Sequence, residues 1–197
     1  QADDSRQHAL AQVIAGVDRM THLVGQLLTL ARVDPARQDA TPQPLDPAEI
    51  IATVCAEMLP QAQRRGQALT VNAASGCRVA VNAEWLRIAL RNLVDNALRY
   101  AGAGAHIEVR LTRDGSACAL TVADDGPGVA PALRAQLCAR FVRGEVEDEG
   151  CGLGLSIVAR IAALSHAQLE LGDGLPRAEG GRGFAATLRF GEAAVPG

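Results

Sequence analysis

The chain has few aromatic residues and lacks any long apolar run. Aromatic side chains make up 3% of its 197 residues, so alanine, valine and leucine must build most of the core. No uninterrupted apolar stretch reaches the ~20 residues that a membrane-spanning helix needs, and no signal-peptide pattern is present. With 48% hydrophobic and 21% charged residues, the composition is typical of a globular protein and excludes a disordered or collagen-like chain.

Paired cysteines and a basic surplus are also missing. The five cysteines contain no Cys-x-x-Cys pair and are scattered over Cys55, Cys77, Cys118, Cys138 and Cys151. Such a set argues against a disulfide framework and a zinc site, and it suits a reducing cytosol. The formal net charge is −3, which favours neither nucleic acid nor an anionic membrane as a partner. We therefore expect no nucleic-acid partner and no membrane contact by this chain.

Residues 1–34 are predicted to form one long helix that ends at Pro35. Apolar residues recur there at alternating spacings of three and four, which is typical of a coiled-coil-like bundle; they are Leu10, Val13, Val17, Met20, Val24, Leu27 and Ala31. The stripe fits either a core helix of a single domain or a bundle helix whose partners lie elsewhere. Residues 35–45 contain several prolines and are predicted to be a linker, which favours the bundle helix.

Residues 46–197 are predicted to be a second domain in which helices and strands alternate. Predicted helices begin at Asp46-Pro47, Asn82 and Leu153 and end near Arg65, Tyr100 and Leu164. Predicted strands cover Leu69–Asn72, Val79–Val81, Ile107–Thr112, Ala117–Ala123, Leu169–Leu171 and Phe184–Phe190, with a Gly-rich loop between the last two. This mixture predicts an α+β fold, a two-layer α/β sandwich in which one helical layer covers a mixed, mainly antiparallel sheet.

A pair of amides on the second predicted helix is the first candidate for chemistry. Asn92 and Asn96 are four positions apart and share one face of the helix, with Arg99 close to that face and Tyr100 next in the chain. Two amide oxygens could complete the ligand shell of a Mg²⁺ ion that already carries phosphates, because this ion prefers oxygen and takes few protein ligands. The alternative is a solvated polar face without a ligand.

An acidic residue followed by glycines is the second candidate. Asp124 comes directly after a predicted strand, and Gly126 and Gly128 follow it. The carboxylate could accept a hydrogen bond from an exocyclic amine such as that of adenine, and the glycines would let the backbone approach a ligand closely. Without further motifs, an ordinary turn explains the same residues.

A Gly-rich helix start and an arginine-flanked Phe complete the set. The glycines of Gly150–Leu155 lead into the third predicted helix, where free backbone N–H groups and the helix dipole favour a phosphate group. Between this segment and Asp124 lies Arg140–Gly144, in which two arginines flank a Phe. That stretch fits either a surface loop held by one aromatic residue or a lid that brings an arginine to phosphate.

The order and spacing of these motifs resemble those of a known family. Asn-x-x-x-Asn, Asp-x-Gly-x-Gly, Arg-Phe-x-Arg-Gly and Gly-x-Gly-Leu-Gly-Leu are similar to the N, G1, F and G2 boxes of the sensor histidine kinase ATP-binding domain, over roughly residues 45–190. This domain belongs to the ATPase superfamily of Hsp90, gyrase and MutL. Residues 16–34 resemble the second helix of the family's dimerisation and phosphoacceptor hairpin.

The resemblance implies an ATP-binding site and residue roles within it. Its members would be Asn92, Asn96, Arg99, Tyr100, Asp124, Gly126, Gly128, Val129, Arg140, Phe141, Arg143, Gly152, Leu153, Gly154 and Thr187. Asn96, assisted by Asn92, would coordinate Mg²⁺, and Asp124 would bind the adenine amine. Either Arg140 or Arg143 would reach the γ-phosphate from the lid.

The remaining members have supporting roles in the same resemblance. Arg99 would neutralise phosphate charge, and Tyr100 would lie beside the base or sugar. The segment Gly152–Gly154 would hold phosphates at the helix start. Thr187 would contact the edge of the adenine.

The family's acceptor histidine has no counterpart in this sequence. None of His8, His22, His106 and His166 is followed by the acidic residue and the proline of the family's acceptor motif. We therefore expect residue 1 to lie after the phosphoacceptor helix of a longer protein, and we expect this chain alone not to phosphorylate itself.

The resemblance also implies an activity, partners and a location for the whole protein. A protein histidine kinase transfers the γ-phosphoryl group of ATP to a histidine and then to an aspartate of a response regulator receiver domain. It would be a homodimer through the hairpin and would form the cytoplasmic portion of a bacterial inner-membrane protein. Two alternatives are an anti-sigma-type kinase of the same superfamily and a nucleotide-sensing adaptor that binds a partner through the apolar stripe between Leu10 and Ala31.

Overall fold

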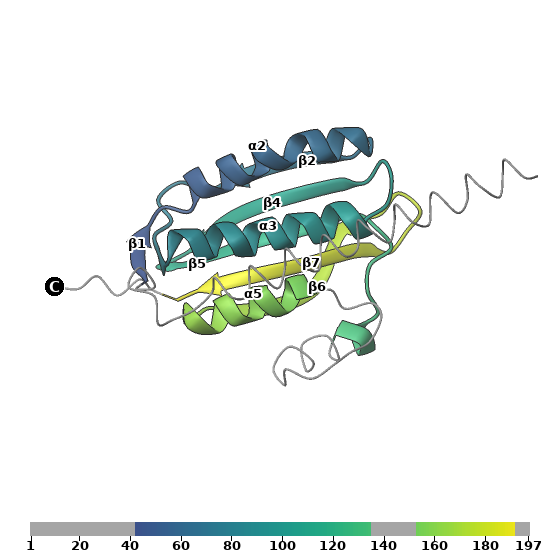
Figure 1. Ribbon diagram of the computed structural model, residues 1–197. Helices are drawn as coiled ribbons and strands as arrows, with labels where there is room; N and C mark the ends of the chain where they lie inside the picture. Colours follow the sequence, from purple (N-terminus) through teal and green to yellow (C-terminus); the bar gives the residue numbers. More distant parts are fainter. Residues whose placement is uncertain (1–41, 135–152, 192–197) are drawn as a thin grey trace, which may run out of the picture.

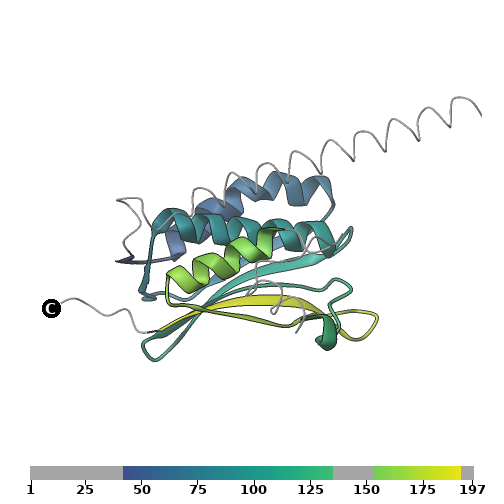
Figure 2. The ribbon, with the colours of Figure 1, turned by 60° about the horizontal axis from the view of Figure 1, so that its bottom comes forward.

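A computed structural model describes residues 42–134 and 153–191, which form two layers. Three helices lie side by side on one face of a sheet (Figures 1 and 2). They are α2 (Ala48–Arg64), α3 (Ala83–Tyr100) and α5 (Leu153–Leu164), with α3 in the middle. The predicted α+β two-layer sandwich is confirmed. The helix predicted over residues 1–34 and the segment Arg140–Gly144 lie outside the described residues.

The main sheet is mixed and mostly antiparallel. Its order is β2-β4-β5-β7-β6, in which β2 pairs with β4 in parallel and the other pairs are antiparallel. The strands are β2 (Ala68–Ala73), β4 (His106–Asp114), β5 (Ala117–Asp124), β6 (Gln168–Pro176) and β7 (Arg182–Phe190). Because β5 is central and antiparallel to both neighbours, its last residue lies among the ends of β4, β7 and β6.

The prediction that residues 43–45 belong to a linker is wrong. Gln43–Leu45 forms strand β1, which pairs antiparallel with β3 (Val79–Val81) in a separate two-stranded sheet. Pro44 lies opposite Ala80 in this pairing. Proline is tolerated because β1 is an edge strand, where a missing N–H need not break a sheet ladder.

The helix boundaries follow local chemistry closely. The Asn82 side chain accepts a hydrogen bond from the backbone N–H of Trp85 at 3.1 Å, so it caps α3 as predicted. Before α2, Asp46 Oδ1 accepts the N–H of Ala48 at 2.9 Å. Pro60 lies inside α2 without ending it. It is exposed, so the backbone carbonyl that lacks its usual N–H partner can be hydrated.

The last two strands are longer than predicted. The sequence predicts strands only at Leu169–Leu171 and Phe184–Phe190, whereas β6 continues to Pro176 and β7 begins at Arg182. Glycines within both strands lowered the strand signal. The hairpin pairing of β6 with β7 nevertheless keeps these residues in the sheet, with an irregularity between Asp173 and Pro176.

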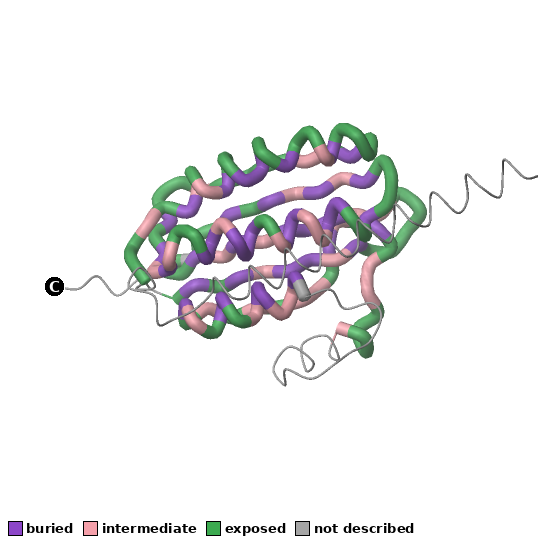
Figure 3. Tube along the Cα trace, viewed as in Figure 1, coloured by how far each residue is buried: buried purple, intermediate pink, exposed green. Residues whose placement is uncertain are grey.

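The core lies between the helices and the sheet. Figure 3 shows buried positions along the inward sides of both layers. Alternate residues of the central strands face the helices and are almost fully buried; they include Ile107, Val109, Leu111, Leu120, Val122 and Leu188. Aliphatic side chains dominate this core, as the scarcity of aromatic residues predicts. In the part of the chain that the structure describes, none of the helices combines the length and apolar character needed to cross a bilayer.

Candidate functional site

Asp124 is a buried carboxylate at the end of the central strand β5. Its exposed fraction is 5%. Oδ1 accepts the backbone N–H of Gly126 at 2.9 Å and that of Phe184 at 3.2 Å. Within the described residues both of these bonds fall on Oδ1, so Oδ2 retains its capacity to accept a hydrogen bond from a ligand.

The surroundings of Asp124 disfavour its charge. Burial raises the pKa of Asp124 above its ordinary value of 3.8, and the negative charge of Asp125 raises it further, while the N–H groups of Gly126 and Phe184 act in the opposite direction. A carboxylate that is costly to ionise and lies at a strand end is a candidate binding residue. A hydrogen-bond donor on a ligand would offset part of that cost.

The two predicted glycines after Asp124 lie against other backbone segments. A Cβ on Gly126 would be 2.5 Å from the Cα of Ala101, just beyond the C-terminal end of α3. A Cβ on Gly128, whose φ is +71°, would be 2.5 Å from the carbonyl oxygen of Arg182 at the start of β7. Glycine at both positions therefore brings the turn after Asp124 into direct contact with α3 and β7.

Two further glycines at this place were not predicted as site residues. A Cβ on Gly183 would be 1.9 Å from the Asp124 carbonyl oxygen, and a Cβ on Gly174 would be 2.4 Å from the same atom. They let β7 and β6 close around the end of β5. The signal available in the sequence was the occurrence of glycine within two otherwise strand-like segments, which indicates close backbone approach.

The amides of α3 are half-buried and lie on the flank away from α2. On the α2 side, Arg91 Nη1 contacts Glu57 Oε2 at 2.9 Å, and Gln61 Nε2 donates to Asp95 Oδ1 at 3.3 Å. Asn92 follows Arg91 in the sequence, and Asn96 follows Asp95. Each amide is therefore turned by about 100° around the helix axis from the residue that contacts α2. That rotation turns Asn92 and Asn96 away from the side of α3 that contacts α2.

One of these amides has its nitrogen engaged by the backbone. Asn92 Nδ2 donates to the carbonyl oxygen of Ile88 at 2.8 Å. This bond uses the nitrogen, so the oxygen, which is the atom that a cation would need, takes no part in it. The side chain of Asn92 is thereby held in place by its own helix.

The start of α5 lies beside the C-terminal half of α3. The two helices run antiparallel (Figures 1 and 2), and they are in direct contact. Gly154 is buried within the first turn of α5, and Leu153 is its first residue, as predicted. The positive end of the α5 helix dipole thus lies beside the half of α3 that carries the two amides.

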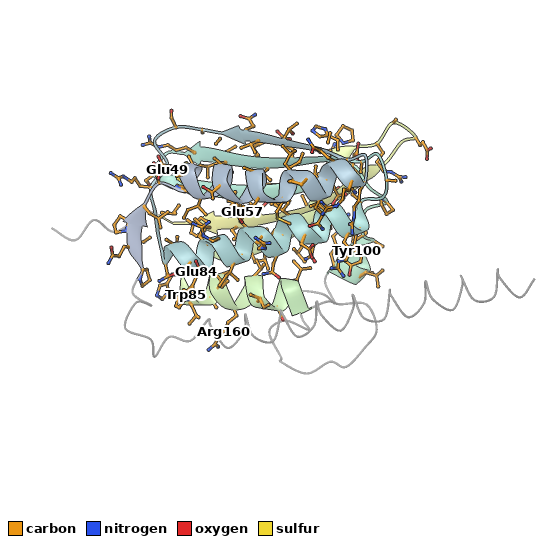
Figure 4. All side chains as sticks on the ribbon, turned by 45° about the horizontal axis from the view of Figure 1, so that its top comes forward. Glu49, Glu57, Glu84, Trp85, Tyr100 and Arg160 are labelled. Atoms are coloured by element: carbon orange, nitrogen blue, oxygen red, sulfur yellow. The ribbon has the colours of Figure 1, made fainter. Side chains whose placement is uncertain are left out.

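The residues at the end of α3 are more exposed. Arg99 Nη2 is 3.5 Å from Asp95 Oδ2, one turn earlier on the helix. Tyr100 is 57% exposed and projects at the C-terminal end of α3, the opposite end from Glu84 and Trp85 (Figure 4).

The structure does not bring Thr187 together with the rest of the predicted site. Thr187 lies opposite Thr121 in the pairing of β7 with β5, and their hydroxyl oxygens are 2.9 Å apart. Its neighbours Ala186 and Leu188 are buried on the helical side, so the side chain of Thr187 points to the other face of the sheet. The predicted contact with adenine overlooked this alternation, which depends on the strand's register.

Val129 is held by an arginine that sequence reasoning missed. Arg134 Nε donates to the carbonyl oxygen of Val129 at 2.5 Å, and Arg134 Nη2 is 2.5 Å from Asp173 Oδ1 on β6. The pairing joins the segment after Gly128 to the edge strand. No local pattern marks Arg134, because its partner Asp173 is distant in the sequence. The predicted site residues Arg140, Phe141, Arg143 and Gly152 lie outside the described residues.

Comparison with known proteins agrees with this geometry. Residues 81–193 match the family described as histidine kinase-, DNA gyrase B-, and HSP90-like ATPase. The chain belongs to this ATPase family. It is 38% identical over 189 residues to the sensor protein QseC of Salmonella typhi, covering 94% of this chain and 40% of that protein.

Solved structures place the chain near the histidine kinase branch of the ATPase family. It resembles the cytoplasmic segment of histidine kinase QseC with a TM-score of 0.58 and 28% identity, covering 90% of this chain and 95% of that one. It also resembles full-length ShkA in complex with AMPPNP, with a TM-score of 0.69 and 28% identity, covering 98% of this chain and 40% of that one. The predicted resemblance to sensor histidine kinase ATP-binding domains is confirmed. The chain spans about 40% of the length of its curated relative QseC.

The residues of this ATPase domain fit a nucleotide and its metal ion. Asp124 offers a carboxylate oxygen for an amine, and glycine at positions 126 and 128 lets the turn beside it pack closely against the end of α3 and the start of β7. In residues 42–134 and 153–191 no group of three or more His, Cys, Asp or Glu side chains is arranged to hold a metal ion. The side-chain oxygens of Asn92 and Asn96 are the kind of protein ligand that a phosphate-bound Mg²⁺ ion takes.

Proposed function

We propose that this chain is the ATP-binding catalytic portion of a sensor histidine kinase. The observation that carries the proposal is Asp124, a buried carboxylate whose Oδ1 is held by two backbone N–H groups at the end of the central strand. Oδ2 would accept the exocyclic amine of adenine. The AMPPNP-bound relative ShkA supports a nucleotide as the ligand, because AMPPNP is an ATP analogue.

The phosphates would lie between α3 and the start of α5. There the amide oxygens of Asn92 and Asn96 would hold Mg²⁺, which supplies charge neutralisation for the phosphate groups. The N–H groups at the start of α5 would contact the phosphates directly. Because phosphoryl transfer depends on positioning and charge stabilisation, these residues bind and orient ATP and need not take part in covalent chemistry.

The whole protein would pass the phosphoryl group on in two steps. The γ-phosphoryl group would go to a histidine of a dimerisation hairpin, and from there to an aspartate of a response regulator receiver domain. Residues 1–34 would be the second helix of that hairpin, followed by a short linker and the catalytic domain. The hairpin would form the homodimer, and this portion would lie on the cytoplasmic side of a bacterial inner-membrane protein.

Nucleotide binding tests the site directly. Isothermal titration with AMPPNP and Mg²⁺ should show binding to the wild-type chain. Asp124→Asn keeps an oxygen for Gly126 and Phe184 but presents an amide to the adenine amine, so affinity should fall by about 10- to 100-fold. Asp125→Asn is the matched control, because it removes the neighbouring charge and keeps the oxygen that accepts the His106 N–H at 2.8 Å. Equal affinity of wild type and Asp124→Asn contradicts the proposed site.

The proposed metal ligands and the expected lack of a phosphoacceptor histidine have their own tests. Asn96→Ala should weaken binding of AMPPNP in the presence of Mg²⁺ and have little effect on it in the presence of a chelator.

Incubation of the chain with labelled ATP should leave it without acid-labile label. Label on His8 or His22 would show that the chain contains its own acceptor.

A further inference from the structure

The connection between α2 and β2 holds the C-terminal end of α3. Gln67, the residue before β2, is 6% exposed. Its Nε2 donates to the carbonyl oxygen of Leu98 at 2.9 Å and to that of Gly102 at 2.6 Å. Both acceptors belong to the last turn of α3 and the residues after it, where carbonyl groups have no partner within the helix. One side chain thus spans the end of the helix.

A neighbouring arginine strengthens the same contact. Arg65 Nη1 donates to the Leu98 carbonyl oxygen at 2.6 Å, and the backbone N–H of Gly104 donates to the Arg65 carbonyl oxygen at 3.4 Å. The connection itself is shaped by Gly66, whose φ is +64°, and by the bond from the Gln67 N–H to Ala62 at 3.0 Å. The end of α3 is therefore bound at several points by residues 65–67.

This same end of α3 lies against the turn that presents Asp124. Ala101 is located between the two carbonyl groups that Gln67 binds, and its Cα would be 2.5 Å from a Cβ on Gly126. The N–H of Gly126 in turn donates to Asp124 Oδ1 at 2.9 Å. A displacement at the end of α3 is thus transmitted through one backbone contact and one hydrogen bond to the carboxylate.

The chemistry of Gln67 argues against a purely stabilising role. Its Oε1 is buried and has no hydrogen-bond partner among the described residues. An unsatisfied buried oxygen lowers stability, and an apolar side chain of similar size would avoid that cost. Glutamine offers what such a side chain lacks, namely two N–H donors in a fixed plane that reach two carbonyl groups at once.

We infer that Gln67 is a positioning residue for adenine recognition. By holding Leu98 and Gly102, it keeps Ala101 against Gly126 and so keeps the Asp124 carboxylate in the orientation that accepts the exocyclic amine. This inference rests on the proposed binding of ATP. It predicts that a residue with no direct contact to the nucleotide controls selectivity for the base.

A ratio of two affinities separates positioning from stability. Titration calorimetry compares ADP with inosine diphosphate, which carries an oxygen in place of the exocyclic amine, both with Mg²⁺. Wild type should prefer ADP by about tenfold or more. Gln67→Met should narrow this preference to about threefold or less. A change in the folded fraction alters both affinities equally and leaves their ratio unchanged.

Two further variants serve as parallel and control. Arg65→Met removes an exposed side chain that donates to the same Leu98 carbonyl oxygen. It should also narrow the preference for ADP over inosine diphosphate, by a smaller factor than Gln67→Met does. Val79→Ala lies in the fully buried part of β3; it should lower the melting temperature and leave the preference as in wild type. Retention of the wild-type preference in both Gln67→Met and Arg65→Met overturns the inference and leaves the proposed ATP site intact. A wild type without any preference for ADP overturns both.

Discussion

Gly183 lies so close to Asp124 that a Cβ on Gly183 would be 1.9 Å from the Asp124 carbonyl oxygen and 2.8 Å from its Oδ1. The contact joins the start of β7 to the end of β5. The candidate carboxylate is therefore held by two strands of the sheet as well as by its own turn. This rigidity is suited to recognition of a planar base by a single hydrogen bond.

The first prediction concerns this contact. Gly183→Ala should lower the free energy of unfolding by about 1–3 kcal/mol or more, because either β5 or β7 must shift to admit the methyl group. It should also weaken nucleotide binding. The matched control is Gly172→Ala in β6, where a Cβ would meet no atom within 4 Å; it should leave stability unchanged or slightly higher. Urea unfolding measures both variants, and equal stabilities would contradict the close contact.

The second prediction concerns the charge of Asp124. Its pKa is raised in the folded chain, so between pH 3.8 and that raised pKa the folded state holds a proton that the unfolded chain has released. Stability therefore falls as the pH rises through this window and stays lower above it. Asp124→Asn should be more stable than wild type at neutral pH, and the difference should shrink toward pH 3.8.

The measurement is urea unfolding of wild type and Asp124→Asn at a series of pH values. Glu179→Gln is the control for the loss of one negative charge, because the side chain of Glu179 is 89% exposed; it should track wild type at every pH. If the free energy of unfolding of Asp124→Asn exceeded that of wild type by the same amount at every pH, the Asp124 carboxylate would not carry the cost of burying its charge.

The third prediction concerns the start of α3. Asn82→Ala removes the oxygen that accepts the Trp85 N–H and should lower the free energy of unfolding by ~1 kcal/mol. Asn82→Asp keeps an acceptor at that place and should lose much less. Because Asn82 lies at the opposite end of α3 from Gly126, binding of AMPPNP should be unaffected in both variants. A loss of binding without loss of stability would contradict this separation.

The fourth prediction concerns the buried thiols. Burial raises the pKa of Cys55 to about 11. Burial together with the adjacent Cys118 thiol raises the pKa of Cys77 to about 12. Alkylation requires the thiolate, so at mildly alkaline pH a two-unit rise slows iodoacetamide labelling roughly 100-fold. Mass spectrometry of peptides should find both residues labelled at least this much more slowly in the folded chain than in urea. Similar rates in the two conditions would contradict their burial.

Local features of the fold were predictable from sequence because they depend on neighbours in the chain. The cap at Asn82 and the helix boundaries at Tyr100, Leu153 and Leu164 follow from residues within one turn of each end. The strand ends of β6 and β7 were not predictable in this way. Their glycines weaken strand propensity, and only the pairing of β6 with β7 keeps them extended.

The sequence alone determined which residue types are available to the site and which share a face of α3: the amides Asn92 and Asn96, and an acid followed by glycines at Asp124. Tertiary structure decided what those residues can do. Burial and the N–H groups of Gly126 and Phe184 define the properties of the Asp124 carboxylate, strand register turns Thr187 to the far face, and a distant loop brings Gln67 to the end of α3. The physical reason is that helix periodicity is a property of consecutive residues, whereas burial, register and contact depend on segments that only folding brings together.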